Sequence, residues 1–561
     1  MRKVLPIGRD NFRNLRTGNK ENYYVDKTLM IRDFIDYNNA VSLITRPRRF
    51  GKTLNMTMLR DFVDIEQDSS GIFSGLNIME TEYADHINTR PVIFLSFKNC
   101  SGETIKIMKN SLAHALKSEY FRCEEVFSRQ ADFTSNKNEE FYSTLKVFKK
   151  ISEAKEDKEG KLQVAQMPDE MLKRSLVVLV RAVAGFYNKN PLLLIDEYDQ
   201  PLIKAHEMGY REEFSKGIYG GFLGNALKGN DYLDQALLTG IQRVAKESIF
   251  SEVNNFVVYT VLDDEYARYF GLSRDETREL LEYYDLELSK EVTSYYDGYS
   301  FANADVYNPW SILSYAQKKK LQSYWVNTST NELIRESVIT AEKMFHRSFK
   351  KLIANGSVAV RLNLDASFIE LAKTETLWGL LVNAGYLTVI HADYHLRRFT
   401  VRIPNEEIKR EFELIVSDYT KLSSELLQDM FLALIDGDMD EFLNIYRELV
   451  IDSTSCHDNR ENAYHMLFLG MVMNLRELYD IKSNIESGLG RSDIIMKSKD
   501  ARRMHVVIEF KHGSDVENLK YKALKQIHEK KYYTGLTGDV LCVGIAHDIK
   551  LCQLVSEVIQ C

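Results

Sequence analysis

One segment of the chain combines a glycine, a lysine and a threonine in an arrangement that binds phosphate groups. It reads Arg46-Pro-Arg-Arg-Phe-Gly-Lys-Thr53, follows an apolar run at residues 40–45 and leads into helix-forming residues 54–62. A loop between a strand and a helix turns backbone N–H groups toward a phosphate, its lysine reaches the β- and γ-phosphates, and its hydroxyl group binds Mg²⁺. The general pattern begins with glycine, and Arg46 lacks the freedom of glycine to adopt positive φ. The segment predicts an ATP site formed by Arg46, Pro47, Arg48, Arg49, Phe50, Gly51, Lys52 and Thr53.

A second segment supplies the carboxylates that such a loop requires. The apolar residues 191–195 predict a core strand, and Asp196 and Glu197 follow it. We expect Asp196 to hold Mg²⁺ together with Thr53, and Glu197 to orient or deprotonate the attacking water. The alternative is an ordinary strand that ends in an acidic turn, but the order of the two segments favours a nucleotide site. Arg243, which ends another apolar run, could contact the γ-phosphate or form a surface salt bridge, and its position alone does not separate these roles.

The elements around these segments alternate between the two kinds of secondary structure. Further strands are predicted at residues 91–97, 235–243 and 255–261, and helices at residues 141–151 and 170–187. This alternation is typical of an α/β fold with a doubly wound, mostly parallel sheet. Such a sheet would place the phosphate-binding loop and the two carboxylates at the same edge.

A second α/β pattern lies near the carboxyl terminus. Apolar and β-branched runs predict strands at residues 479–483, 488–496 and 505–511. The turn-rich residues 497–501 allow the last two strands to pair as a hairpin. In a hairpin the start of one strand lies beside the end of the other, so these two regions are expected to share a site.

Those two regions contain Asp493, Glu509 and Lys511. Glu509 and Lys511 are two residues apart on a strand and share a face, whereas Phe510 points to the other face. Two carboxylates can hold one or two Mg²⁺ ions that polarise a phosphodiester, and a lysine can position hydroxide or neutralise developing charge. The alternative is a surface hairpin with a cross-strand ion pair, but residues 506–508 are too apolar for a free hairpin.

The composition excludes several classes of protein. The 561 residues are 44% hydrophobic and 27% charged, as in globular chains with several domains. No apolar run reaches the roughly 18 residues needed to span a membrane, and the amino terminus lacks the apolar segment of a signal peptide, so we expect a cytoplasmic protein. The six cysteines form no C-x-x-C pair, which argues against a zinc knuckle. A net charge of −8 argues against coating of nucleic acid by bulk charge but permits a local basic groove.

Two groups of side chains leave their role open. The aromatic residues Tyr295, Tyr296, Trp310 and Trp325 could stack on bases, although packing between layers is the more common use of such residues. The predicted helix at residues 519–531 carries lysines all round its surface. They could face a phosphate backbone or form a solvated surface.

The first part of the chain resembles the AAA-ATPase-like proteins, P-loop ATPases whose loop reads Arg-Pro-Arg-Arg-Phe-Gly-Lys-[Ser/Thr]. That family has arginine where this chain has Arg46, so the resemblance implies ATP binding in spite of the missing glycine. Further blocks that resemble the family extend to about residue 412, and they are Tyr24-Val-Asp-Lys-Thr28, Thr239-Gly-Ile241, Asn254-Asn255, Tyr295-Tyr-Asp-Gly-Tyr299, Tyr307-Asn-Pro-Trp-Ser311, Trp325-Val-Asn-Thr328 and Ile403-Pro-Asn405.

The last part, from about residue 452 to 544, resembles the PD-(D/E)XK nuclease superfamily, in the branch fused behind AAA-ATPase-like domains. Ser492 stands where the usual pattern has proline. The matching blocks are Asn484-Ile-Glu-Ser-Gly-Leu-Gly-Arg-Ser-Asp493, Ile508-Glu-Phe-Lys511 and Ala523-Leu-Lys-Gln-Ile527. The resemblance implies that Asp493 and Glu509 are metal ligands and that Lys511 is the catalytic lysine. It also implies that Glu461 is the acid on the first helix and that Gln526 lies on the helix after the site.

These expectations combine into four segments and one function. We expect an AAA-ATPase-like P-loop domain at residues 1–272, a helical lid or connector at 273–419, a helical linker at 420–450 and a PD-(D/E)XK nuclease-like α/β domain at 451–561. The expected function is ATP hydrolysis coupled to Mg²⁺-dependent cleavage of phosphodiester bonds, with DNA as the expected substrate. The alternative is a nucleotide-operated switch whose last domain binds a partner or nucleic acid without cutting it. The sequence leaves open RNA against DNA, strandedness, and association into a homo-oligomer.

Overall fold

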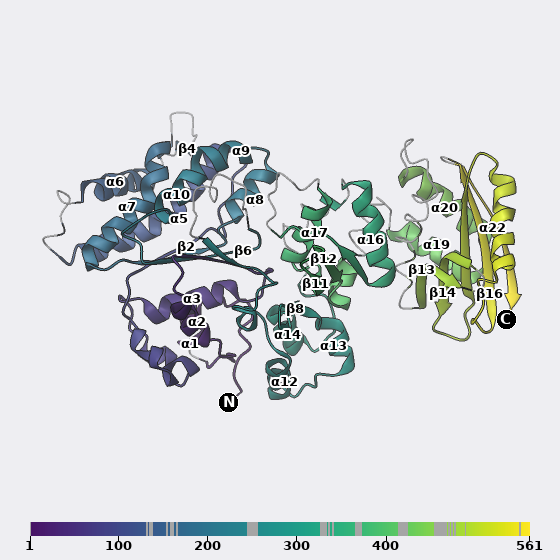
Figure 1. The fold of residues 1–561 in the computed structure, drawn as a ribbon, viewed down its shortest axis with the longest axis horizontal. Coiled ribbons are helices and arrows are strands. Elements are labelled where there is room, and N and C mark those ends of the chain that lie inside the picture. Colours follow the sequence, from purple (N-terminus) through teal and green to yellow (C-terminus); the bar gives the residue numbers. More distant parts are fainter. Residues whose placement is uncertain are drawn as a thin grey trace. The chain divides into compact units, whose positions relative to one another are not determined.

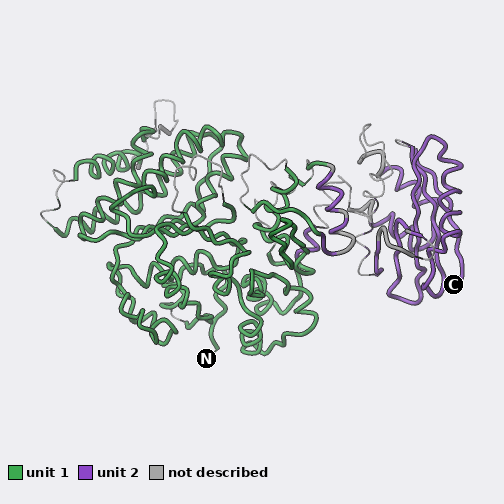
Figure 2. Tube along the Cα trace, viewed as in Figure 1, with its two compact units in different colours: residues 1–342, 359–407 green, residues 343–358, 408–561 purple. Residues whose placement is uncertain are grey.

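The computed structural model divides into two compact units (Figures 1 and 2). Unit 1 is Met1–Glu342 with Ala359–Glu407, and unit 2 is Lys343–Val358 with Ile408–Cys561. The structure describes the chain except for residues 1, 19, 131–132, 134–137, 153–154, 157–161, 164–166, 244–255, 326–333, 335–336, 339–340, 365–372, 413–423, 454–467, 469–471, 473–474, 476–477, 488–489 and 549–550.

A five-stranded parallel sheet forms the centre of unit 1. Its strands are β1 (Val41–Thr45), β2 (Val92–Ser96), β5 (Leu192–Asp196), β6 (Gln235–Gly240) and β7 (Phe256–Tyr259), in the spatial order β2-β5-β6-β1-β7. All neighbouring strands run parallel. Every residue of β1, β5 and β6 is buried, as their continuous apolar runs predict for central strands of a parallel sheet. The predicted fold class is therefore confirmed.

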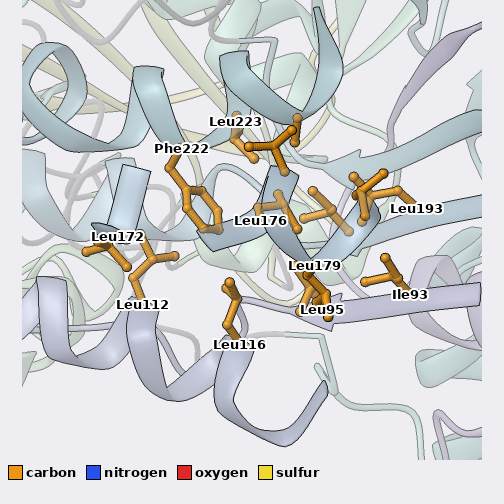
Figure 3. Packing of buried hydrophobic residues seen from close by; sticks show 14 of the residues in the cluster. Ile93, Leu95, Leu112, Leu116, Leu172, Leu176, Leu179, Leu193, Phe222 and Leu223 are labelled. Carbon is orange, nitrogen blue, oxygen red and sulfur yellow. The ribbon is translucent and has the colours of Figure 1, made fainter. Parts of the chain in front are cut away.

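Helices cover both faces of this sheet (Figure 1). α2 (Leu29–Tyr37) and α3 (Lys52–Val63) lie on one side, and α5 (Ile105–Phe127), α7 (Asp169–Tyr187) and α10 (Gly220–Leu227) lie on the other. Burial of aliphatic side chains between strands and helices is the main source of stability in such a layer. Figure 3 shows this packing for Ile93, Leu95, Leu112, Leu116, Leu172, Leu176, Leu179, Leu193, Phe222 and Leu223.

The predicted helices are confirmed as α6 (Glu139–Ser152) and α7, whereas the long helix α5 was not predicted. The buried residues of α5, from Met108 through Leu112 and Leu116 to Tyr120, recur at helical spacing, so the sequence contained the signal for this helix. The shorter elements around the sheet are α1 (Phe12–Arg16), α4 (Ser70–Phe73), η1 (Asn77–Glu80), η2 (Glu82–His86), β3 (Lys155–Glu156), β4 (Leu162–Gln163), α8 (Gln200–Glu207), α9 (Arg211–Phe214) and η3 (Ser215–Tyr219).

The middle region contains strands as well as helices. The predicted cap is present, because Ser273 and Glu276 form a capping box at the start of α12 (Arg274–Tyr283). Short strands were not predicted here, since runs of three to six residues carry little periodicity. The elements are η4 (Ala267–Tyr269), α13 (Lys290–Tyr296), β8 (Tyr299–Phe301), β9 (Ala304–Val306), α14 (Pro309–Lys318), β10 (Ser357–Val360), α17 (Thr374–Asn383), β11 (Thr388–Asp393) and β12 (Arg398–Arg402).

Unit 2 has a mixed sheet in the order β13-β14-β15-β16-β17. The predicted hairpin is confirmed, because β14 and β15 pair antiparallel, whereas β15 and β16 are parallel and α22 connects them. The parallel connection through a helix buries one face of the sheet. The bounds are α16 (Lys343–Asn355), α19 (Ser424–Asp436), α20 (Met439–Ser453), β13 (Tyr479–Ser487), β14 (Gly490–Ser498), β15 (His505–His512), α22 (Val516–Lys530), β16 (Asp539–Asp548) and β17 (Leu551–Gln560).

The segment expected as a helical linker, residues 420–450, contains two helices. α19 ends at Asp436 and α20 begins at Met439, and Gly437 between them has a φ of +79°. A left-handed residue cannot continue a right-handed helix, so the chain turns at this glycine. Within the described part of the chain, no helix is both long and apolar enough to cross a membrane.

Candidate active sites

The phosphate-binding loop lies between β1 and α3, as predicted. Gly51 precedes α3 with a φ of +89°, and Arg49 has a φ of +67°. The loop therefore places its left-handed residues at these two positions, which explains how it turns without glycine at position 46. The Lys52 amine is buried and donates to the carbonyl oxygens of Arg46 at 2.8 Å and Pro47 at 2.9 Å. Burial lowers the pKa of Lys52, and nearby carboxylates partly oppose this effect.

The side chain of Arg46 has a structural role in the loop. It is completely buried and donates to the carbonyl oxygens of Thr45 at 2.8 Å, Tyr259 at 3.1 Å and Glu265 at 3.3 Å. Its guanidinium group also lies 5.4 Å from the ring centres of Phe270 and Phe301. Burial lowers its pKa to about 10, so the group stays charged at neutral pH. All these contacts are with protein, and the backbone N–H of Arg46 also donates to the Gly240 carbonyl at 3.2 Å, so Arg46 holds the loop in place.

The predicted Mg²⁺ ligands lie in contact with each other. The Thr53 hydroxyl donates to Asp196 Oδ2 at 2.7 Å, and the Thr239 hydroxyl donates to Asp196 Oδ1 at 2.6 Å. A hydroxyl group and a carboxylate at this distance fit the oxygen-rich surroundings that Mg²⁺ prefers. The next residue, Glu197, has a φ of +53°. Burial raises the pKa of Glu197, which suits a group that accepts a proton.

The loop after β6 is fixed by residues that follow the acidic strand. Asp199 Oδ2 accepts the backbone N–H groups of Ile241 and Gln242, both at 2.9 Å. A side chain on Gly240 would approach Asp199 Oδ1 to 2.7 Å, so glycine permits this contact. Arg243 follows directly and is half-buried, which leaves its predicted contact with the γ-phosphate a prediction.

Sequence reasoning missed Gln242 in this loop. Its side chain is 1% exposed, and its Oε1 atom has no hydrogen-bond partner among the described residues. A buried polar atom without a partner is costly, and a ligand or water would relieve that cost. Its position after the end of a central parallel strand was the available signal.

The remaining arginines and the phenylalanine of the loop face other parts of unit 1. Arg48 donates to Gln200 Oε1 at 3.5 Å, and Phe50 is wholly buried against Tyr299 and Phe301. The side chain of Phe50 thus anchors the loop to the middle region. Of the four aromatic residues whose role was open, Tyr295, Tyr296 and Trp325 are at most 7% exposed, which favours packing, whereas Trp310 is half-buried and contacts Arg49.

The second predicted site also forms. Asp493 on β14 accepts the backbone N–H of Phe510 at 2.8 Å, so it lies beside the end of β15. Lys511 donates to Glu509 Oε1 at 2.9 Å, and Gln526 on α22 donates to the same oxygen. The site therefore brings together four of the predicted residues. Glu461 lies outside the described residues.

Glu509 is the most strongly perturbed group of this site. It is 3% exposed, and burial followed by the charge of Asp493 raises its pKa to about 7. Its Oε2 atom is buried without a hydrogen-bond partner among the described residues. A cation bound between the two carboxylates would satisfy this oxygen and favour the ionised form, so these residues fit a hard divalent metal ion. The described residues contain no group of three or more metal-ligating side chains, so further ligands would be backbone oxygens or water.

Tyr532 is a further residue of this site that the sequence did not reveal. Its hydroxyl oxygen accepts the second N–H of Gln526 at 2.9 Å, and its side chain is almost fully buried. The two hydrogen bonds fix the orientation of the glutamine amide, so that its nitrogen faces Glu509. Tyr532 follows α22 in a turn, where periodicity gives no signal.

Both halves of the chain match known families at the places where these sites lie. A family described as "Predicted AAA-ATPase" matches residues 6–250, and the PD-(D/E)XK nuclease superfamily matches residues 459–557. The chain carries an AAA-ATPase-like domain and a PD-(D/E)XK nuclease superfamily domain. The expected resemblance to both families is confirmed over these residues, whereas the expected blocks from Asn254 to Asn405 lie outside the residues matched by the first family. The first matched region contains the phosphate-binding loop and Asp196, and the second contains the site around Asp493.

Two further similarities are weaker. A protein of Azotobacter chroococcum mcd 1, described as an uncharacterized protein in the vnfD 5' region, is 25% identical over 415 residues, which cover 73% of this chain and 69% of that protein. The Walker-type ATPase PABY2304 of Pyrococcus abyssi is similar in structure at a TM-score of 0.36 and 14% identity, over 73% of this chain and 99% of that one.

Proposed function

We propose that the AAA-ATPase-like domain binds and hydrolyses ATP with Mg²⁺, and that the nuclease domain cleaves phosphodiester bonds of DNA with a divalent metal ion. The observation that carries the proposal is the convergence of Asp493, Glu509 and Lys511 on one face of the sheet. A metal ion bound there would polarise the phosphodiester.

Each residue of the nuclease site has its own proposed role. Asp493 and Glu509 would hold the cation, and the hydrogen bond from the Phe510 N–H fixes the Asp493 carboxylate on the site face. Lys511 lies within reach of the same face, where its charge can neutralise the charge that develops on the phosphate. Gln526 orients Glu509 through its amide nitrogen.

The residues of the ATP site act in a similar way. Lys52 would exchange its carbonyl partners for the β- and γ-phosphates, and Thr53 with Asp196 would hold Mg²⁺. Glu197, whose pKa burial raises, would accept the proton of the attacking water. Arg243 would contact the γ-phosphate from the loop that Asp199 fixes.

The nuclease proposal is tested on the purified chain with Mg²⁺ or Mn²⁺. Cleavage is assayed on single-stranded DNA, double-stranded DNA and RNA, each with ATP, with a non-hydrolysable analogue and with neither. Asp493→Asn and Lys511→Ala should abolish cleavage and leave ATP turnover nearly unchanged. Lys216→Ala is the control, because Lys216 is an exposed lysine of unit 1 whose ion pair is with Glu212. An absence of cleavage under all conditions would instead support a binding switch.

The ATP proposal is tested by separate measurements of binding and turnover. Lys52→Ala should weaken ATP binding, whereas Glu197→Gln should keep binding and lose hydrolysis. If Lys52→Ala binds and hydrolyses ATP like the wild type, the assignment of the loop is wrong.

A further inference from the structure

The two-residue segment Tyr324–Trp325 in the middle region contacts the phosphate-binding loop. Arg49 donates through Nη1 to the carbonyl oxygens of Tyr324 at 2.8 Å and Trp325 at 3.2 Å. The indole Nε1 of Trp325 donates in return to the carbonyl oxygen of Arg48 at 3.3 Å. Arg49, which has a positive φ, and Arg48 are therefore both hydrogen-bonded to this segment.

The same segment is held from its other side by Glu407. Glu407 Oε1 accepts the backbone N–H of Tyr324 at 2.6 Å and that of Trp325 at 2.9 Å, and Oε2 accepts the hydroxyl of Ser311 at 2.8 Å. Glu407 is 1% exposed, so these bonds are made away from water. Hydrogen bonds to a buried carboxylate are among the stronger ones, and loss of the acceptor leaves two buried N–H groups without a partner.

Arg49 and Glu407 thus form hydrogen bonds with opposite sides of Tyr324–Trp325. The carbonyl groups of the segment face the guanidinium, and its N–H groups face the carboxylate, so the peptide group between Tyr324 and Trp325 lies between opposite charges. The guanidinium of Arg49 also lies 4.3 Å from the ring centre of Trp310, whose indole N–H donates to the Tyr324 carbonyl at 3.0 Å. These contacts restrict Arg49 to one conformation.

We propose that Glu407 is a positioning residue for the phosphate-binding loop, which holds Arg49 in its left-handed conformation through Tyr324–Trp325. This inference rests on the proposed ATP site. Glu407 is also the last residue of unit 1.

The test combines one measurement without nucleotide and one with it. Hydrogen exchange of residues 46–52 reports the order of the loop in the nucleotide-free chain, and the dissociation constant of a fluorescent ATP analogue with Mg²⁺ reports binding. Glu407→Ala is compared with Glu407→Gln, which keeps an acceptor oxygen. Glu276→Ala is the matched control, since this partly buried glutamate bonds to Lys27 and caps α12.

Glu407→Ala should accelerate exchange in the loop and raise the dissociation constant about tenfold or more, the effect of losing one strong hydrogen bond. Glu407→Gln should restore binding to within about threefold of wild type, and Glu276→Ala should change neither readout. If Glu407→Ala does not fold, Ser311→Ala takes its place and should raise exchange and the dissociation constant by a smaller factor.

Two results would overturn the inference. The first is a folded Glu407→Ala variant with the hydrogen exchange and the dissociation constant of the wild type. If Ser311→Ala is used instead, the same result in Ser311→Ala has the same meaning. The other is an equal loss in Glu407→Ala, Glu407→Gln and Glu276→Ala, which would indicate general destabilisation. If the wild type binds no nucleotide while Glu407→Ala still loosens the loop, the ATP proposal fails and the positioning by Glu407 stands.

Discussion

Arg46→Gly would give the loop the glycine of the general P-loop pattern, and we expect the protein to lose stability rather than gain nucleotide affinity. Arg46 supplies the donors for three carbonyl oxygens and packs between two phenylalanine rings. Glycine supplies none of these contacts. The turn also has no need of glycine there, because its left-handed residues are Arg49 and Gly51.

The expected loss can be worked from these contacts. Burial lowers the pKa of Arg46 from 12.5 to about 10, so keeping the charge buried costs about 3 kcal/mol. Three hydrogen bonds from a charged donor contribute about 1.5–3 kcal/mol each and outweigh this cost. Removal of a wholly buried large side chain adds a packing loss on the scale of about 2–5 kcal/mol. The net decrease in the free energy of unfolding should be about 4 kcal/mol or more, a large part of the stability of a typical domain.

Tryptophan fluorescence during urea unfolding measures this loss, because Trp310, Trp325 and Trp378 all lie in unit 1. Arg2→Gly is the control, since Arg2 forms an exposed ion pair with Asp285 and its loss should cost less than about 1 kcal/mol. Arg46→Met, which keeps volume but donates no hydrogen bond, should fall between wild type and Arg46→Gly. An Arg46→Gly variant as stable as wild type with tighter ATP binding would refute the structural role.

Three further substitutions have defined outcomes. Gly240→Ala should push the Asp199 carboxylate from its backbone partners, cost about 1–3 kcal/mol in urea unfolding and lower ATP turnover. Burial raises the pKa of Asp64 from 3.8 to about 6, so the stability given by its protonated form is lost as the pH rises from about 4 to 6. Asp64→Asn should remove this loss and increase the free energy of unfolding by up to about 3 kcal/mol at pH 8. Urea unfolding at several pH values measures the difference. Tyr532→Phe should free the Gln526 amide and slow cleavage about threefold to tenfold at saturating metal, with an unchanged rate contradicting the role of Tyr532.

The sequence predicted those parts of the fold and sites that depend on local pattern. Continuous apolar runs identified the buried strands, and residues at strand ends identified Asp196. The two-residue period placed Glu509 and Lys511 on one face. The hairpin then brought Asp493 beside them, because a turn-rich segment separated two apolar runs. In each case one short-range rule was enough.

The parts that the sequence did not reveal depend on contacts between distant residues. The burial of Arg46 follows from carbonyl groups at Tyr259 and Glu265, more than two hundred residues away. The roles of Gln242 and Tyr532 follow from loops that lie beside the sites. Local periodicity contains no information on such partners, and a motif names only the residues that recur within it.

Two glycines of the middle region make close contacts with other parts of unit 1. A side chain on Gly298 would lie 2.0 Å from the Pro404 carbonyl oxygen, so the block that contains Gly298 must pack directly on the block that contains Pro404. A side chain on Gly385 would likewise lie 2.9 Å from the ring of Pro47 in the loop itself. Real Cβ atoms do not approach other heavy atoms so closely, so each glycine is required by the contact as well as by its positive φ. The middle region of unit 1 therefore packs directly against the phosphate-binding loop at Gly385, and Gly385→Ala should displace Pro47 and disturb the order of the loop.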